Sequence, residues 1–140
     1  MKLRIVMLKS NNFSAKYRVY YEDTDAGGIV YYANYLKFFE RARTDFLRHL
    51  GISQNELVKK EKLVFVVRHC ELDYVRPAQL DDFLEVSVAV EKIGAASIVM
   101  NQEIKVEGQL FVSLKVEIVT VDVDGFRPRK IPAELRELLV

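Results

Sequence analysis

One long helical pattern dominates the first half of this 140-residue chain, and it constrains the fold more than any other feature. Apolar residues recur at spacings of three and four between Ala33 and Leu50, which predicts an amphipathic helix with one buried face. Gly51 follows directly and is suited to end the helix in a left-handed conformation. The expected apolar face comprises Leu36, Phe39, Ala42, Phe46, Leu47 and Leu50.

Most of the remaining chain has the pattern of β-strands. A short strand is expected before the helix, from Lys16 to Tyr21, because the run is rich in aromatic and β-branched residues. Longer strands are expected at residues 63–74, 83–93, 98–106 and 109–122. The first of these is apolar on both faces from Leu63 to Val67, as in a strand covered on two sides. A capping box beginning at Ser53 predicts a short second helix to about Lys60. Residues 132–138 should form a last helix.

These elements predict an α+β fold in which one antiparallel sheet wraps around a single long helix. Short turns between the strands make neighbouring strands antiparallel. A sheet with one apolar face needs a cover, and only the helix at residues 33–50 carries a large enough apolar stripe. The length indicates one domain, which we place at residues 15–140 behind an N-terminal extension of residues 1–14.

Charge and cysteine content exclude several classes of protein. The formal net charge is +1, so we expect no electrostatic attraction to nucleic acid or to an anionic membrane. The single cysteine, Cys70, cannot form an intramolecular disulfide, which fits the cytoplasm, and we expect it to be a small buried hydrophobe. No apolar run is long enough to span a membrane. No cluster has metal-ligand spacing, so we expect neither a metal nor a cofactor.

An acidic, glycine-containing turn joins the first strand to the long helix, from Glu22 to Gly28. Adjacent glycines permit positive φ and close approach of a ligand. An acid just before a helix lies beside unpaired backbone N–H groups. A carboxylate together with N–H donors, here those of residues 28–34, is what an acyl-transfer site needs. The alternative is a turn whose acids satisfy only local backbone groups.

The residues from Tyr21 to Tyr35, followed by Phe39 to Arg43, resemble the hotdog-fold acyl-CoA thioesterases of the 4-hydroxybenzoyl-CoA thioesterase type. The chain is most similar to the subgroup associated with the Tol-Pal cell-envelope system of Gram-negative bacteria, over about residues 16–138. The resemblance implies a hotdog fold and hydrolysis of an acyl-CoA to free acid and CoA. It also implies a homo-oligomer, commonly a tetramer built as a dimer of dimers.

The resemblance further implies that Asp25 is the catalytic carboxylate and that the backbone N–H of Tyr32 polarises the thioester carbonyl. Asp25 could attack the carbonyl or activate water, and the sequence leaves both open. Asp23, Gly27 and Gly28 are expected to support the turn. Many members of the subgroup carry His at the position of Tyr32, so an imidazole is excluded here and the acyl preference could differ.

Two further groups of residues are weaker candidates. Glu40 is a possible secondary acid, since other hotdog enzymes use an acid on this helix. However, Lys37, Arg41 and Arg43 surround it at helical spacings and favour a structural ion pair. CoA carries phosphates, which arginine recognises well. The candidate phosphate contacts are Arg68, Arg76, Arg127, Arg129 and Lys130.

Three functions are compatible with such a site. The first is an acyl-CoA thioesterase, for which an acyl carrier protein is a further possible partner. The second is a hotdog dehydratase or hydratase, but these enzymes usually pair an acid with His, and no His lies in this motif. The third is a non-catalytic module that binds acyl-CoA or acyl carrier protein. The sequence does not distinguish aromatic from aliphatic acyl groups.

Overall fold

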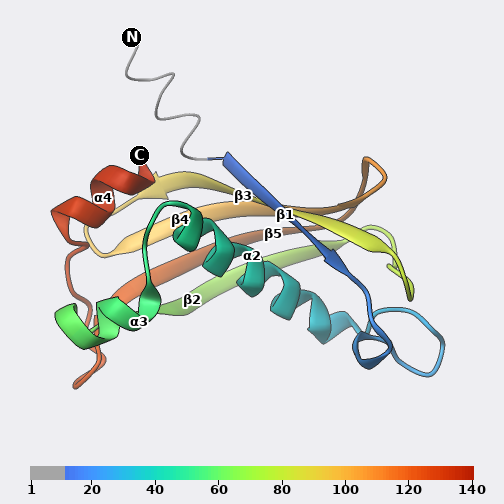
Figure 1. Cartoon of the computed structure of the whole chain (residues 1–140), viewed down its shortest axis with the longest axis horizontal. Coiled ribbons are helices and arrows are strands. Elements are labelled where there is room, and N and C mark those ends of the chain that lie inside the picture. The colour runs from blue at the N-terminus through green and yellow to red at the C-terminus, as the bar shows by residue number, and fades with distance from the viewer. Residues whose placement is uncertain (1–11) are drawn as a thin grey trace, which may run out of the picture.

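The computed structural model describes residues 12–140, in which an antiparallel sheet lies over one long helix (Figure 1). The strands are β1 (Asn12–Arg18), β2 (Leu63–Tyr74), β3 (Phe83–Ile93), β4 (Ser97–Val106) and β5 (Gln109–Asp122). The helices are α2 (Tyr35–His49), α3 (Gln54–Glu56) and α4 (Ala133–Leu139), with 3₁₀ turns at Tyr21–Asp23 and Tyr32–Asn34 and a π-helical turn at Leu57–Glu61. The strand order is β1-β3-β4-β5-β2, and all neighbours are antiparallel. The predicted α+β architecture is confirmed.

α2 buries one face against the sheet, and its aromatic side chains form the centre of the core. Phe38, Phe39 and Phe46 are fully buried, as is the small side chain of Ala42. Leu36 was expected on this face but is 43% exposed. Successive helical residues are rotated by about 100°, so the stripe centred on Phe39 and Ala42 leaves Leu36 at its border.

The alternation predicted for β3, β4 and β5 is confirmed, but the burial expected for the edge strand β2 is not. The buried face of β3, β4 and β5 contains Leu84, Val86, Val88, Ile98, Met100, Ile104, Val112, Leu114, Val116 and Ile118. Among the described strands, β2 pairs only with β5 and therefore forms an edge of the sheet. Val67 on β2 is 52% exposed, so the prediction that this strand is covered on both sides was wrong.

The predicted ends of the first strand and of the long helix needed correction. β1 pairs with β3 from Asn12 to Arg18, so it begins within the segment we assigned to the N-terminal extension. The rest of that segment, residues 1–11, lies outside the described residues. Tyr21 belongs to a 3₁₀ turn rather than to the strand. α2 starts two residues later than predicted because Tyr32–Asn34 wind as a 3₁₀ helix. Gly51 ends it with a φ of 88°, as expected.

The shorter helices also follow their sequence signals. Ser53 Oγ accepts a hydrogen bond from the N–H of Glu56 at 3.3 Å, which confirms the predicted cap of the second helix. α4 begins directly after Pro132. Cys70 is half-buried. None of the helices in residues 12–140 is long and apolar enough to cross a membrane.

Candidate active site

The acidic turn forms a tight loop at one end of the molecule, between β1 and α2 (Figure 1). The N–H of Asp25 donates to the carbonyl of Ile29 at 2.9 Å, and the N–H of Gly28 donates to the carbonyl of Asp25 at 3.0 Å. Gly28 has a φ of 82°, which side chains with a Cβ rarely adopt. The glycine at this position is therefore a backbone requirement of the loop.

The carboxylate of Asp25 is exposed at the surface of this loop. Its Oδ1 accepts a hydrogen bond from the N–H of Gly27 at 2.9 Å, which orients the carboxyl group. A Cβ at Gly27 would lie 3.4 Å from the same oxygen, at the near limit of an ordinary van der Waals contact. The loop thus presents an accessible acid in a defined orientation.

A distant segment, Ala78–Leu80, holds the glycine side of the loop. The N–H of Val30 donates to the carbonyl of Ala78 at 2.8 Å, and the N–H of Leu80 donates to the carbonyl of Gly28 at 3.2 Å. The N–H of Ala78 in turn donates to the hydroxyl of Tyr35 at 3.0 Å. Burial raises the pKa of Tyr35, which keeps this hydroxyl neutral. These contacts fix the loop against α2, and no local sequence signal indicated them.

The start of the 3₁₀ helix supplies the N–H donors beside the loop. The expected donors spanned residues 28–34, but several are already bonded: Gly28, Val30, Tyr31 and Asn34 all donate to backbone carbonyls. Tyr32 is the first residue of its 3₁₀ helix, so its N–H has no acceptor inside that helix. Among the backbone bonds of residues 12–140, none uses the Tyr32 N–H as donor. It is therefore available to a ligand.

Asp23 is buried beneath the loop and is only 3% exposed. Its Oδ2 accepts a hydrogen bond from the N–H of Tyr20 at 2.9 Å. Its Oδ1 has no hydrogen bond within the described residues, but the ammonium of Lys37 lies 3.7 Å away. This geometry matches a supporting role for the buried Asp23, whereas the carboxylate of Asp25 is accessible.

Three tyrosine rings, those of Tyr31, Tyr32 and Tyr74, cluster at the start of the 3₁₀ helix. The rings of Tyr31 and Tyr32 have centroids 4.9 Å apart, and Tyr74 at the end of β2 meets Tyr32 edge-on at 6.5 Å. The hydroxyl of Tyr74 donates to the carbonyl of Tyr32 at 3.3 Å. Hydrogen bonding to Tyr32 raises the pKa of Tyr31, and burial raises that of Tyr74. All three rings remain partly exposed, so they can line a binding surface with an apolar body and a polar edge.

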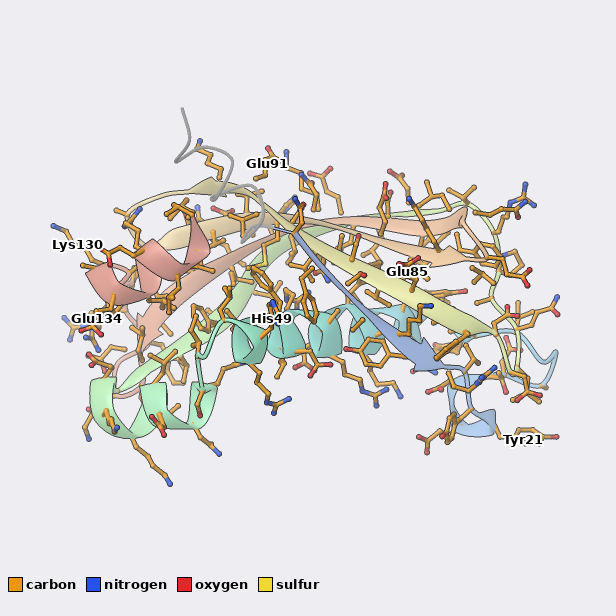
Figure 2. The ribbon with its side chains drawn as sticks, turned by 45° about the horizontal axis from the view of Figure 1, so that its top comes forward. Tyr21, His49, Glu85, Glu91, Lys130 and Glu134 are labelled. Carbon is orange, nitrogen blue, oxygen red and sulfur yellow. The ribbon has the colours of Figure 1, made fainter. Side chains whose placement is uncertain are left out.

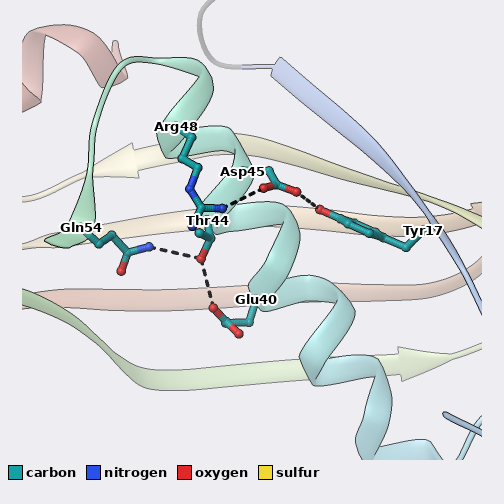
Figure 3. Close-up of polar contacts among 6 residues, drawn as sticks. All are labelled: Tyr17, Glu40, Thr44, Asp45, Arg48 and Gln54. Carbon is teal, nitrogen blue, oxygen red and sulfur yellow. Dashed lines mark hydrogen bonds and ion pairs between the residues drawn. The ribbon is translucent and has the colours of Figure 1, made fainter. Parts of the chain in front are cut away.

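Glu40 lies away from this loop, in a polar network on the outer side of α2 (Figure 3). Its Oε2 accepts a hydrogen bond from the hydroxyl of Thr44 at 3.0 Å, and that hydroxyl accepts one from the amide of Gln54 at 3.2 Å. The rise of the helix places Glu40 about 12 Å from Tyr32. The structure thus brings Glu40 together with α3 rather than with Asp25.

The candidate phosphate contacts are divided between different parts of the molecule. Arg76 lies two residues after the end of β2, close in sequence to the segment Ala78–Leu80 that holds the loop. Arg68 lies on β2, where its Nε is 3.9 Å from a carboxylate oxygen of Glu117. Lys130 is at the opposite end of the molecule from Tyr21 (Figure 2). The neighbouring basic residues on this C-terminal segment are Arg127, which is exposed, and Arg129, whose Nη1 donates to the carbonyls of Glu61 at 2.6 Å and Lys62 at 3.4 Å.

Metal-ligating side chains do not gather anywhere in residues 12–140: no group of three His, Cys, Asp or Glu side chains is placed to hold an ion. The loop and its neighbours present a carboxylate, a backbone N–H and tyrosine hydroxyls.

Comparison with known proteins gives consistent matches along nearly the whole chain. Residues 19–139 match the family model of the thioesterase-like superfamily. The acyl-CoA thioesterase YbgC of Haemophilus influenzae is 42% identical, over 90% of this chain and 93% of its own length. The crystal structure of a probable thioesterase from Bartonella henselae matches with a TM-score of 0.83 and 40% identity, over 86% of this chain and 99% of its own.

A more distant structure extends the likeness in fold. The crystal structure of a mutant 4-hydroxybenzoyl CoA thioesterase complexed with 4-hydroxybenzoyl CoA matches with a TM-score of 0.85. The identity is 23%, over 93% of this chain and 99% of the other. The expected resemblance and the hotdog fold are both confirmed by these matches.

Proposed function

The chain belongs to the thioesterase-like superfamily, and from that premise we propose that it hydrolyses an acyl-CoA to free acid and CoA at the loop that carries Asp25. One observation carries the proposal: the exposed, oriented carboxylate of Asp25 shares its loop with an unbonded N–H at Tyr32. A thioester carbonyl needs an attacking oxygen and a donor for the developing negative charge, and these two groups supply them.

Two routes use the same groups. In the first, a carboxylate oxygen of Asp25 forms a bond to the thioester carbon, the C–S bond breaks, CoA leaves as thiolate, and water then hydrolyses the mixed anhydride. In the second, Asp25 takes a proton from water as the water oxygen attacks the same carbon; the C–S bond then breaks, CoA leaves as thiolate, and the thiolate takes up the proton. In both, the N–H of Tyr32 donates to the carbonyl oxygen, and the dipole of α2 favours negative charge at that end of the helix.

The Asp25 loop and the basic segment of residues 127–130 could lie together only if they came from two different copies of the chain. Lys130 lies at the end of the molecule away from Tyr21 and the Asp25 loop, and Arg127 and Arg129 are close to it in the sequence. We infer that these three residues contact the CoA phosphates of the partner's site while Arg76 serves its own. The exposed edge of β2 supports this assembly, because an unpaired edge strand can pair with its copy. Antiparallel pairing of β2 with β2 would bring opposite ends of two chains together. We propose that two such dimers assemble into a tetramer, a dimer of dimers.

From the resemblance to the Tol-Pal-associated subgroup, we propose a cytoplasmic thioesterase associated with the Tol-Pal system, with acyl-CoA as substrate and acyl carrier protein as a further partner. Size-exclusion chromatography with light scattering tests the tetramer, and a pull-down with acyl carrier protein tests the partner.

Replacement of Asp25 by Asn tests the catalytic assignment. Asp25→Asn keeps the shape of the side chain but removes the nucleophile or base, so release of thiol from acyl-CoAs should fall by at least about 10²–10³-fold. The control is Glu22→Gln, which removes an exposed acid from the same turn and should change the rate less than about threefold. Activity of Asp25→Asn within tenfold of wild type would sink the assignment. Turnover of an enoyl-CoA without thiol release would indicate a hydratase, and binding without turnover a non-catalytic module.

A further inference from the structure

One backbone carbonyl, that of Asp23, joins the acidic turn to the start of the helical segment. It accepts a hydrogen bond from the N–H of Tyr31 at 3.1 Å and another from the side-chain amide of Asn34 at 2.9 Å. The two donors flank Tyr32 in the sequence, so the residue with the free N–H is held on both sides. The side chain of Asp23 is itself fixed by the N–H of Tyr20 and by the nearby ammonium of Lys37.

Asn34 does not perform the local role that its position favours. It immediately precedes α2, where asparagine commonly accepts a hydrogen bond from the first turn of the helix. Here its backbone is helical, with φ −73° and ψ −17°, and its side chain makes no capping bond. Instead the amide reaches back eleven residues along the chain to the Asp23 carbonyl. The contact therefore connects the two halves of the candidate site and adds nothing to the capping of the helix.

We propose that Asn34 is a positioning residue for thioester polarisation: its amide holds the Tyr31–Asn34 turn against the Asp23 carbonyl and so directs the Tyr32 N–H toward the carbonyl that Asp25 attacks. This inference rests on the proposed function and deepens it. Asn34 touches neither substrate nor reacting atoms. Its loss leaves the N–H of Tyr31 as the one donor to that carbonyl among the described residues, so the turn at Tyr31–Asn34 loses one of its two hydrogen bonds to the acidic turn.

The consequence is a defect in chemistry rather than in binding. A backbone donor must lie at about 2.7–3.1 Å from the developing oxyanion, and a displacement of about 1 Å can reduce the rate by about a hundredfold. Binding of CoA through its phosphates and pantetheine does not depend on that donor. We therefore expect Asn34 variants to lose kcat while KM changes little.

Two variants of Asn34 separate the hydrogen bond from the shape of the side chain. Asn34→Ala removes the amide, and Asn34→Asp keeps its shape but places a second acceptor against the Asp23 carbonyl. Both should reduce kcat by about 10- to 100-fold. The matched control is Thr24→Val, which removes a hydrogen bond of 2.8 Å from the same turn, to the carbonyl of Tyr21, without touching the helical segment. Its kcat should stay within about twofold of wild type at a similar loss of Tm.

A spectroscopic measurement reports on the donor directly. A ketone analogue, in which a methylene group replaces the thioester sulfur of the acyl-CoA, can be bound to each variant and its C=O stretch recorded by infrared difference spectroscopy. Polarisation by the Tyr32 N–H should lower the stretch in wild type and in Thr24→Val, and this lowering should shrink in both Asn34 variants.

The outcomes separate this inference from the proposed function. If wild type releases thiol and Asp25→Asn does not, but the Asn34 variants keep the wild-type kcat or the wild-type C=O stretch, the positioning role is wrong and the thioesterase stands. An equal loss of kcat in Thr24→Val would also overturn it, because any disturbance of the turn would then suffice. If wild type releases no thiol from any acyl-CoA, both proposals fall.

Discussion

A buried amide on β4 joins the helix to the sheet, and its replacement should be strongly destabilising. Gln102 is 1% exposed and lies between Met100 and Ile104 on the buried face of β4. Its Oε1 accepts a hydrogen bond from Nη1 of Arg43 at 2.9 Å, and its Nε2 donates to the carbonyl of Phe39 at 3.1 Å. Burial lowers the pKa of Arg43 despite the opposing effect of Glu40, but a guanidinium stays charged at neutral pH.

Substitution of Gln102 by Leu keeps a side chain of similar size but removes both bonds. A hydrogen bond to a charged group contributes about 1.5–3 kcal/mol and a neutral one about 1 kcal/mol. Arg43 would also remain half-buried with no carboxylate within ion-pair distance in residues 12–140. We therefore expect the free energy of unfolding to fall by about 2–4 kcal/mol. In urea, where m is about 2 kcal/mol/M, the midpoint should decrease by about 1–2 M.

A double-mutant cycle tests the physical reason. Arg43→Met removes the charge that Gln102→Leu leaves without an acceptor, so the double variant should be more stable than the sum of the single effects by at least about 1 kcal/mol. The neighbouring exposed amide is the control: Asn101→Leu loses a 2.7 Å bond to Glu91 but should cost less than about 0.5 kcal/mol. All unfolding is measured at one protein concentration, since assembly shifts apparent stability. Additive single effects, or a Gln102→Leu cost near that of Asn101→Leu, would refute the reasoning.

Three further predictions address turns and protonation. Glu107 has a φ of 49° before Gly108, so Glu107→Asn should raise Tm by a few degrees in calorimetry, since Asn-Gly favours this hairpin turn; no rise would contradict the assignment. Gly28→Ala and Gly51→Ala each place a Cβ at a backbone position of similar positive φ, so each should lower the free energy of unfolding by about 1–2 kcal/mol, but only Gly28→Ala should also lower thiol release. Burial and then the hydrogen bond to Asp45 raise the pKa of Tyr17 above its ordinary value near 10 (Figure 3). The neutral form is thus favoured by folding, and the Tm advantage of wild type over Tyr17→Phe should be constant below about pH 9 and shrink above pH 10; a pH-independent difference would argue against it.

The helix and strands were predictable because each depends on residues close together in the sequence. The period of α2 is set by apolar residues three and four apart, and Gly51 ends it wherever the helix packs. Alternation placed β3, β4 and β5 correctly for the same reason. The errors occurred at the ends of elements and on the edge strand β2. Where an element ends depends on its contacts with residues distant in the sequence; pairing with β3, for example, extends β1 to Asn12.

The candidate site divides in the same way. The sequence by itself determined that an acidic glycine turn precedes a helix and that Asp25, Gly27 and Gly28 lie in it. Only the tertiary structure buried Asp23 and left Asp25 exposed. It also bonded Ala78 to the loop from far along the chain, and it separated Lys130 from the loop by the length of the molecule. The physical reason is that local patterns report which face of an element is apolar, whereas burial and hydrogen bonding depend on residues brought together by folding.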